Sequence, residues 1–152
     1  MRHYWSIDFK VIVEGEIRPL QPVIRDEVYR IGREALINAF LHAHASSIEV
    51  ELEYALKRLR VLVRDNGCGI DPHVLRAGRE GHWGLSGMRE RAEGIGAQLK
   101  VWSRVSGGTE VDLTVPGHVA FGTPSTTSFV KWFARLYPRR IVRETEESHK
   151  QK

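Results

Sequence analysis

Apolar and polar residues first alternate along this chain and then recur at a helical spacing. The alternation over residues 6–13 predicts a strand, and the residues Glu14, Gly15 and Glu16 predict a turn after it. From Pro22 to about His44 the apolar residues recur every three to four positions, which predicts a long amphipathic helix. The apolar positions are Ile7, Phe9, Val11 and Val13 in the strand, and Ile24, Val28, Ile31, Ala35 and Ala39 in the helix.

The rest of the folded region shows the same two patterns. Residues 48–54 and 59–64 predict a hairpin of two strands, and residues 99–103 and 109–115 predict a second hairpin around Gly107 and Gly108. Between the hairpins lie a glycine-rich stretch, an irregular segment that runs to Trp83, and a helix predicted over residues 84–95. The predicted order is strand, helix, two strands, loop, helix, two strands.

Composition limits the class of protein. A chain of 152 residues fits one domain, which can bury roughly 70% of the surface of its unfolded form without disulfides. No run of about 18 apolar residues is present, and the first residues lack the apolar stretch of a signal peptide. The single cysteine, Cys68, fits a reducing compartment. We therefore expect a cytoplasmic location.

The positive charge is concentrated at the carboxyl end. The chain has a net charge of +4, but residues 1–129 contain equal numbers of basic and acidic side chains, and the excess lies within residues 130–152. Composition and apolar spacing predict a folded domain over residues 1–117, a linker over 118–128 and a basic amphipathic, partly disordered tail over 129–152. We therefore expect no nucleic-acid partner and no membrane contact by this chain.

The first candidate group of functional residues is Glu34, Asn38 and His42, which are spaced by four on the long helix. Four residues turn a helix by about 400°, so these side chains follow one stripe beside the apolar face. A carboxylate and an amide oxygen suit a hydrated Mg²⁺ ion. The same stripe could instead cap a neighbouring loop.

The second and third candidate groups are glycine-rich. Asp65, Gly67 and Gly69 follow a hydrophobic strand, where the carboxylate can accept a hydrogen bond from an amine and the glycines let a flat ligand approach. Gly84 precedes a helix whose free N–H groups suit phosphates, with Arg89 and Arg91 as nearby positive charges. A plain turn and an ordinary helix start remain alternatives for each group alone.

The three groups in this order resemble the ATP-binding domain of two-component sensor histidine kinases. The matching residues are Glu34 and Asn38, Asp65 with Gly67 and Gly69, Gly84-Leu85, and Gly108-Thr109. More broadly, they resemble the ATPase superfamily that these kinases share with gyrase, the Hsp90 chaperones and the MutL repair proteins. The segments 33–39 and 84–92 resemble in particular the branch of nitrate-sensor and degradation-sensor kinases.

The resemblance covers about residues 5–117 and implies a fold. That fold is an α/β (α+β) two-layer sandwich, in which a mixed sheet of about five strands packs on about three helices, known as the Bergerat-type ATP-binding fold. ATP would lie between the long helix and a mobile lid over residues 70–83. Residues 1–117 would then be the ATP-binding kinase domain.

The resemblance also implies roles at the phosphate end of the ligand. Asn38 matches the asparagine that binds Mg²⁺, and Glu34 matches the catalytic acidic residue that orients or polarises the reacting group. His42 matches a position near the phosphates. Gly84, Leu85 and the N–H groups that follow would contact the phosphates.

At the adenine end, Asp65 matches the aspartate that pairs with the adenine amino group. Thr109 matches its usual partner. Gly67 and Gly69 would keep the floor of the adenine site open, and Ile70 would begin the lid.

In this family the γ-phosphate passes to a histidine on a helical dimerisation domain that lies before the ATP-binding domain. We therefore expect a fragment of a bacterial sensor kinase that has little activity alone. Its partners would be that histidine domain of the same kinase and, indirectly, a response regulator. The full-length sensor could be membrane-anchored, with this chain as its cytoplasmic portion.

Two positions depart from the family pattern. Leu41 stands where relatives often have Lys or Arg, and His82 replaces the first glycine of the motif before Gly84. One alternative is therefore a degenerate module that binds nucleotide as a regulatory switch without transfer. A less favoured alternative is a serine kinase of the anti-sigma type.

Overall fold

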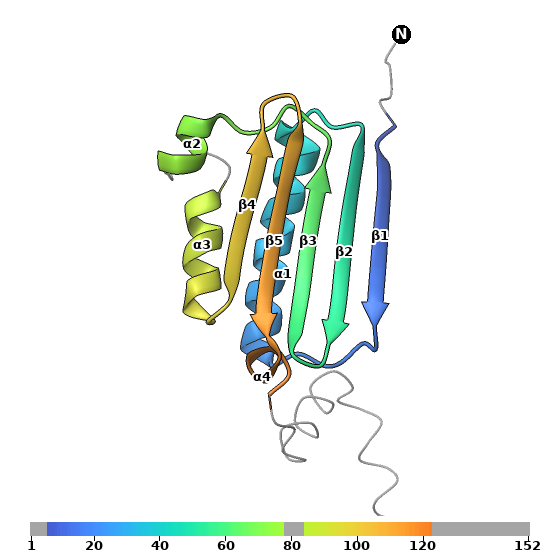
Figure 1. Ribbon diagram of the computed structural model, residues 1–152, viewed down its shortest axis with the longest axis vertical. Helices are drawn as coiled ribbons and strands as arrows, with labels where there is room; N and C mark the ends of the chain where they lie inside the picture. The colour runs from blue at the N-terminus through green and yellow to red at the C-terminus, as the bar shows by residue number, and fades with distance from the viewer. Residues whose placement is uncertain (1–5, 78–83, 123–152) are drawn as a thin grey trace, which may run out of the picture. The chain divides into compact units, whose positions relative to one another are not determined.

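The computed structural model describes residues 6–77 and 84–122 of the chain. Its strands are β1 (Asp8–Gly15), β2 (Ser47–Ala55), β3 (Arg58–Asp65), β4 (Gln98–Arg104) and β5 (Gly108–Pro116). Its helices are α1 (Pro22–Ile37), the π-helical turn η1 (Asn38–His42), α2 (Pro72–Ala77), α3 (Leu85–Gly94) and α4 (Gly117–Ala120). Figure 1 shows α1 crossing behind the sheet, with α2 and α3 near β4.

The five strands form one mixed sheet in the order β1-β2-β3-β5-β4. The predicted hairpins are confirmed, because β2 pairs with β3 and β4 pairs with β5 in antiparallel register. β1 is parallel to β2 because the connection through α1 returns the chain to the same end of the sheet. The predicted two-layer α/β fold is confirmed; the described residues form four α-helices and the turn η1, where about three helices were expected.

The core lies between the sheet and two helices, α1 and α3. The apolar stripe predicted for the long helix is buried on this face, as are three side chains of α3. Full burial of a Val, Leu, Ile or Met side chain stabilises a fold by roughly 1.5–3 kcal/mol. The residues that form this contact are Ile24, Val28, Ile31 and Ala35 of α1, and Leu85, Met88 and Ala92 of α3.

The opposite face of the sheet carries charged residues instead. Arg60 of β3 bonds both carboxylate oxygens of Asp112 on β5, and Arg64 bonds carboxylates on both neighbouring strands. These pairs lie across the strands, so they hold β2, β3 and β5 together on a face that no described helix covers.

Two elements differ from the sequence-based prediction. The segment expected to be irregular up to Trp83 contains helix α2, so that prediction is wrong for residues 72–77. Asp71 caps this helix, because its carboxylate accepts a hydrogen bond from the His73 N–H at 2.7 Å, and Pro72 is its first residue. In addition, α1 changes at Asn38 into the π turn η1, in which the Ala43 N–H donates to the Asn38 carbonyl.

The carboxyl end of the described region packs onto the body. Ala120 of α4 is fully buried, and its carbonyl accepts a hydrogen bond from the Gln21 N–H at 2.8 Å. This helix lies where the linker was predicted to begin. The predicted tail, and residues 78–83 of the predicted lid, lie outside the described residues. Within residues 6–77 and 84–122, no helix is long and apolar enough to cross a bilayer.

Candidate functional site

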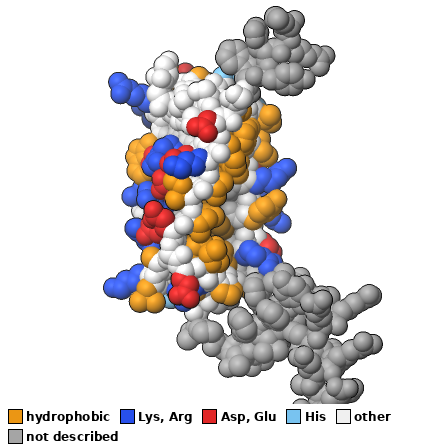
Figure 2. Space-filling model, turned by 90° about the vertical axis from the view of Figure 1, so that its right-hand side faces the viewer, with side chains coloured by type: hydrophobic (Ala, Val, Ile, Leu, Met, Phe, Trp, Pro, Cys, Tyr) orange, Lys and Arg blue, Asp and Glu red, His pale blue; other side chains and the backbone are white. Residues whose placement is uncertain are grey.

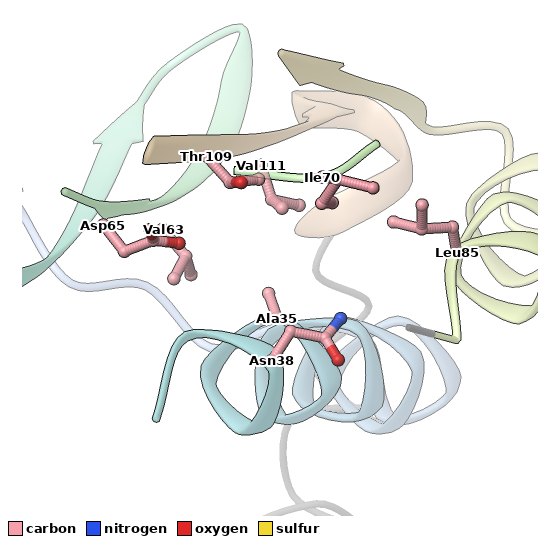
Figure 3. A pocket seen from close by; sticks show the side chains of 8 residues that line it. All are labelled: Ala35, Asn38, Val63, Asp65, Ile70, Leu85, Thr109 and Val111. Carbon is pink, nitrogen blue, oxygen red and sulfur yellow. The ribbon is translucent and has the colours of Figure 1, made fainter. Parts of the chain in front are cut away.

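A narrow pocket lies between α1 and the sheet, and Asn38 of the first candidate group and Asp65 of the second line it. Figure 3 shows Ala35 of α1 and Asn38 of η1 on one side of this pocket, sheet residues on the other, and Leu85 of α3 at one end. Five of the predicted site residues meet here, although they come from four separate segments of the chain. The pocket is lined by Ala35, Asn38, Val63, Asp65, Ile70, Leu85, Thr109 and Val111.

Asp65 is the acidic group of this pocket and the last residue of β3. Its Oδ1 accepts a hydrogen bond from the Gly67 N–H at 2.8 Å, and the backbone of Thr109, directly opposite on β5, also bonds it. Burial raises the pKa of this carboxyl above its ordinary value, and the two backbone hydrogen bonds oppose part of that rise. The pocket therefore presents a half-buried carboxylate whose protonation is sensitive to its surroundings.

The opposite side of the pocket is formed by the end of α1. Asn38, the first residue of η1, is only 8% exposed. Glu34 lies one helical turn earlier, and Gly84 packs against its carboxylate so closely that a Cβ atom at position 84 would clash with it. Gly84 has a φ of 59°, which favours glycine. The start of α3 is thus held beside Glu34 and Asn38, as the motif order predicts.

The glycine loop after Asp65 is held from both sides. A Cβ at Gly67 would collide with the backbone of Ala43, which follows η1, and a Cβ at Gly69 would collide with the Arg104 carbonyl at the end of β4. The Cys68 N–H donates to the Ala43 carbonyl at 2.8 Å. These two glycines therefore let the loop pack closely on protein backbone. This is a different reason for glycine from the predicted one, which was space for a ligand.

Other expected residues lie outside the pocket lining. His42 is exposed at the end of η1 and is not among the residues that line the pocket. Arg91 forms a 3.1 Å ion pair with Glu27 of α1, and Arg89 donates to the Leu75 carbonyl of α2 at 3.3 Å. Both arginines therefore link elements around the site.

Two polar residues of the site region were not identified from the sequence. Asn66 accepts hydrogen bonds from the Ser46 and Ser47 N–H groups, which ties the glycine loop to the start of β2. Ser103 accepts a hydrogen bond from the Ile70 N–H. Asn66 could have been found from its place within the glycine motif, whereas nothing in the sequence around Ser103 signals its contact.

The chemistry of the pocket suits a flat, partly polar ligand. The aliphatic side chains of Ala35, Val63 and Val111 can pack on a ring, and the Asp65 carboxylate can accept a hydrogen bond from an amine. The Asn38 amide oxygen is a suitable Mg²⁺ ligand. The residues present therefore fit a magnesium-bound adenine nucleotide.

Comparisons with known proteins show which family this chain resembles. The family model "Histidine kinase-, DNA gyrase B-, and HSP90-like ATPase" matches residues 24–119. The chain is 39% identical over 85 residues to the nitrate/nitrite sensor protein NarX of Escherichia coli (strain K12), covering 56% of this chain and 14% of NarX.

A second relative and a solved structure extend the match. The signal transduction histidine-protein kinase/phosphatase DegS of Brevibacillus brevis is 34% identical over 110 residues, which cover 72% of this chain and 27% of DegS. The chain thus spans less than a third of the length of these relatives. The catalytic domain of histidine kinase ThkA superposes with a TM-score of 0.61 and 20% identity over 74% of this chain and 80% of that one, which supports the fold.

Proposed function

The chain belongs to the family of histidine kinase-, DNA gyrase B- and HSP90-like ATPases, and on that premise we propose that it binds Mg-ATP and donates the γ-phosphate to a histidine. The acceptor histidine would lie on a helical dimerisation domain of the same sensor kinase. The observation that carries this proposal is that Asn38 and Asp65, from two distant motifs, line one pocket.

The adenine end of the ligand would lie against the sheet. Asp65 would accept a hydrogen bond from the exocyclic amine, while Thr109 and the Gly67 N–H keep its carboxylate in place. Ala35, Val63, Ile70 and Val111 would enclose the ring in apolar surface. Guanine carries a carbonyl where adenine carries this amine, so an ionised Asp65 would disfavour it.

The phosphate end would lie between η1 and the start of α3. Asn38 would hold Mg²⁺, which when bound neutralises phosphate charge, and Gly84 and Leu85 would bring the free N–H groups of α3 to the phosphates. Glu34, held beside Gly84, would orient the group that receives the phosphoryl. Phosphoryl transfer needs mainly such positioning and charge neutralisation.

The proposed partner completes the reaction. The histidine that takes the phosphoryl group would come from the dimerisation domain, and a response regulator would receive it afterwards. We propose a cytoplasmic location for this chain, as part of a sensor that can be membrane-anchored.

Isothermal titration of Mg-ATP tests nucleotide binding directly. We expect heat with the parent chain and much weaker binding by Asp65→Asn, because the amide cannot replace the charged acceptor. The absence of heat with the parent would remove the proposal.

Transfer is tested by supplying the helical dimerisation domain of the same kinase with γ-labelled ATP. We expect acid-labile label on that domain, its loss with Glu34→Gln, and normal transfer by Asp26→Asn, an exposed acidic residue of the same helix. Glu34→Gln should still bind Mg-ATP. Acid-stable label would indicate a serine kinase, and binding without transfer by the parent would indicate a regulatory module.

A further inference from the structure

The hydroxyl of Ser103 lies where the glycine loop meets the hairpin of β4 and β5. The Ile70 N–H donates to Ser103 Oγ at 2.7 Å. Ser103 Oγ also lies 2.9 Å from Thr109 Oγ1 and 3.2 Å from the Gly108 carbonyl. Ser103 is not among the residues that line the pocket, but Ile70 and Thr109 both are.

The strand register places Ser103 in a row with the polar residues of the pocket. Ser103 on β4 is directly opposite Thr109 on β5, and Thr109 is directly opposite Asp65 on β3. The three residues therefore lie side by side across three neighbouring strands. A change in the Ser103 hydroxyl would reach Asp65 through the position of Thr109.

The same hydroxyl fixes the loop. Ile70 is 2% exposed, so its N–H would be left in a nearly dry environment without Ser103. The loop also bonds the hairpin through the Cys68 carbonyl, which accepts from the Ser106 N–H. That backbone bond lies two residues earlier in the loop, so it does not fix Ile70 itself.

We propose that Ser103 is a positioning residue that sets the affinity of the pocket for the adenine part of the nucleotide. It holds Ile70 as one wall and Thr109 as the support of Asp65. It does not act on the phosphates, because Asn38, Glu34 and Gly84 lie on the side of α1 and α3. This inference rests on the proposed function, since it assumes an adenine ligand.

The experiment is a titration of the full chain with ADP and with adenosine, each well below the melting temperature. Ser103→Ala should weaken both ligands by a similar factor, about tenfold, as expected for one lost hydrogen bond to a buried group. The ratio of ADP affinities with and without Mg²⁺ should stay at the parental value. Ser103→Thr, which keeps the hydroxyl, should bind within about threefold of the parent, and the control Thr114→Val, on the charged face of β5, should bind normally.

A purely structural role predicts a different result. It would lower the melting temperature of Ser103→Ala but leave the affinity of the folded protein unchanged, and that outcome overturns the proposal. Weak binding that Ser103→Thr does not restore also overturns it. If the parent chain binds neither ADP nor ATP, the proposed function itself fails, and this inference fails with it.

A measurement on the parent chain covers the case in which Ser103→Ala does not fold. Amide hydrogen exchange should show the Ile70 N–H to be protected to a degree similar to the neighbouring strands, with further protection on ADP binding. An Ile70 amide that exchanges as fast as an exposed loop amide would overturn the inference.

Discussion

Asp65 shows how one buried charge can serve binding at a cost to stability. Burial raises the pKa of its folded form above the unfolded value. Ionised Asp65 therefore makes the folded state less stable at a pH above the folded pKa, and this cost disappears as the pH falls through the range between the two values. An ionised carboxylate that lowers the stability of the fold is typical of a group that binds a ligand.

Asp65→Asn should consequently have opposite effects on folding stability and on ligand affinity. The asparagine Oδ1 can still accept the Gly67 N–H, and no charge is buried, so the melting temperature at neutral pH should be equal to or higher than that of the parent. Affinity for ADP should fall by about tenfold or more, because the charged acceptor is lost. Thermal melts and ADP titrations check this; a large fall in melting temperature would show that the carboxylate serves the fold instead.

The pH dependence of binding follows from the same shift. The affinity of the parent chain for ADP should begin to fall, on acidification, at a higher pH than an aspartate with the ordinary pKa of 3.8 would produce. The residual affinity of Asp65→Asn should lack this step. Titrations in a series of buffers of equal ionic strength measure both, and equal pH profiles would assign the effect to another group.

Gly67 and Gly87 differ in the space that a Cβ atom would have. Gly67→Ala should destabilise the fold by about 1–3 kcal/mol, because its Cβ would collide with Ala43. Gly87→Ala, inside α3, has no atom within 4 Å of the new Cβ and should stabilise by about 0.5–1 kcal/mol through helix propensity. Urea unfolding at constant pH measures both; equal effects of the two substitutions would contradict the packing described for the loop.

At the scale of elements, the charged face of the sheet contains ion pairs of unequal value. The carboxylate of Asp112 is almost fully buried and bonds Arg60 through both oxygens, whereas Arg58, also on β3, pairs with Glu53 of β2 at the surface. Removing one partner of a buried pair leaves the other charge without compensation, while exposed pairs contribute little.

Arg60→Met should therefore cost about 2 kcal/mol of unfolding free energy, and Arg58→Met less than about 1 kcal/mol. Raising the salt concentration should reduce the small effect of Arg58→Met more than that of Arg60→Met. Chemical denaturation at two ionic strengths gives all four values. If both substitutions cost the same, burial of Asp112 would not govern the strength of the pair.

The elements also show what sequence patterns can and cannot predict. Side-chain alternation predicted both hairpins, because the apolar side chains of β3 and β5 lie mainly on the helix side of the sheet. α2 was missed although Asp71 and Pro72 are a recognisable helix start, because the surrounding glycines indicated a loop. The π turn was not predicted, because the apolar spacing from Pro22 to His44 is the same as in an ordinary α-helix.

The sequence also predicted part of the candidate site. The motifs identified Asn38, Asp65, Ile70, Leu85 and Thr109, which the fold brings to one pocket. Ser103 was missed because a single serine in a strand is common, and its contact with Ile70 arises only when two distant segments meet. The roles of all these residues in binding stay predictions until they are measured.

At the scale of the whole folded unit, polar and apolar surfaces are distributed unevenly around the sheet. Among residues 6–77 and 84–122, β1 pairs with a neighbour on one side only, and its helix-side residues Phe9, Val11 and Val13 are about half exposed, together with Phe40 of η1. Figure 2 shows hydrophobic side chains running down the length of this edge. We call these four residues the apolar strip.

The strand residues of the apolar strip, on β1, are separated by β2 from the sheet residues of the pocket, which lie on β3 and β5. A continuous exposed apolar surface binds hydrophobic dyes, whereas a single exposed apolar residue does so poorly. Val11→Thr keeps the shape of the side chain and its preference for a strand, so it should reduce dye fluorescence while leaving ADP affinity unchanged.

Val105→Thr is the matched control, because Val105 is exposed to a similar degree (63% against 52% for Val11) but lies in the turn between β4 and β5. It should change dye fluorescence much less than Val11→Thr. Equal changes would mean that the strip does not act as one surface. A parent chain that binds no dye would mean that the strip is covered in solution, although residues 6–77 and 84–122 leave it exposed.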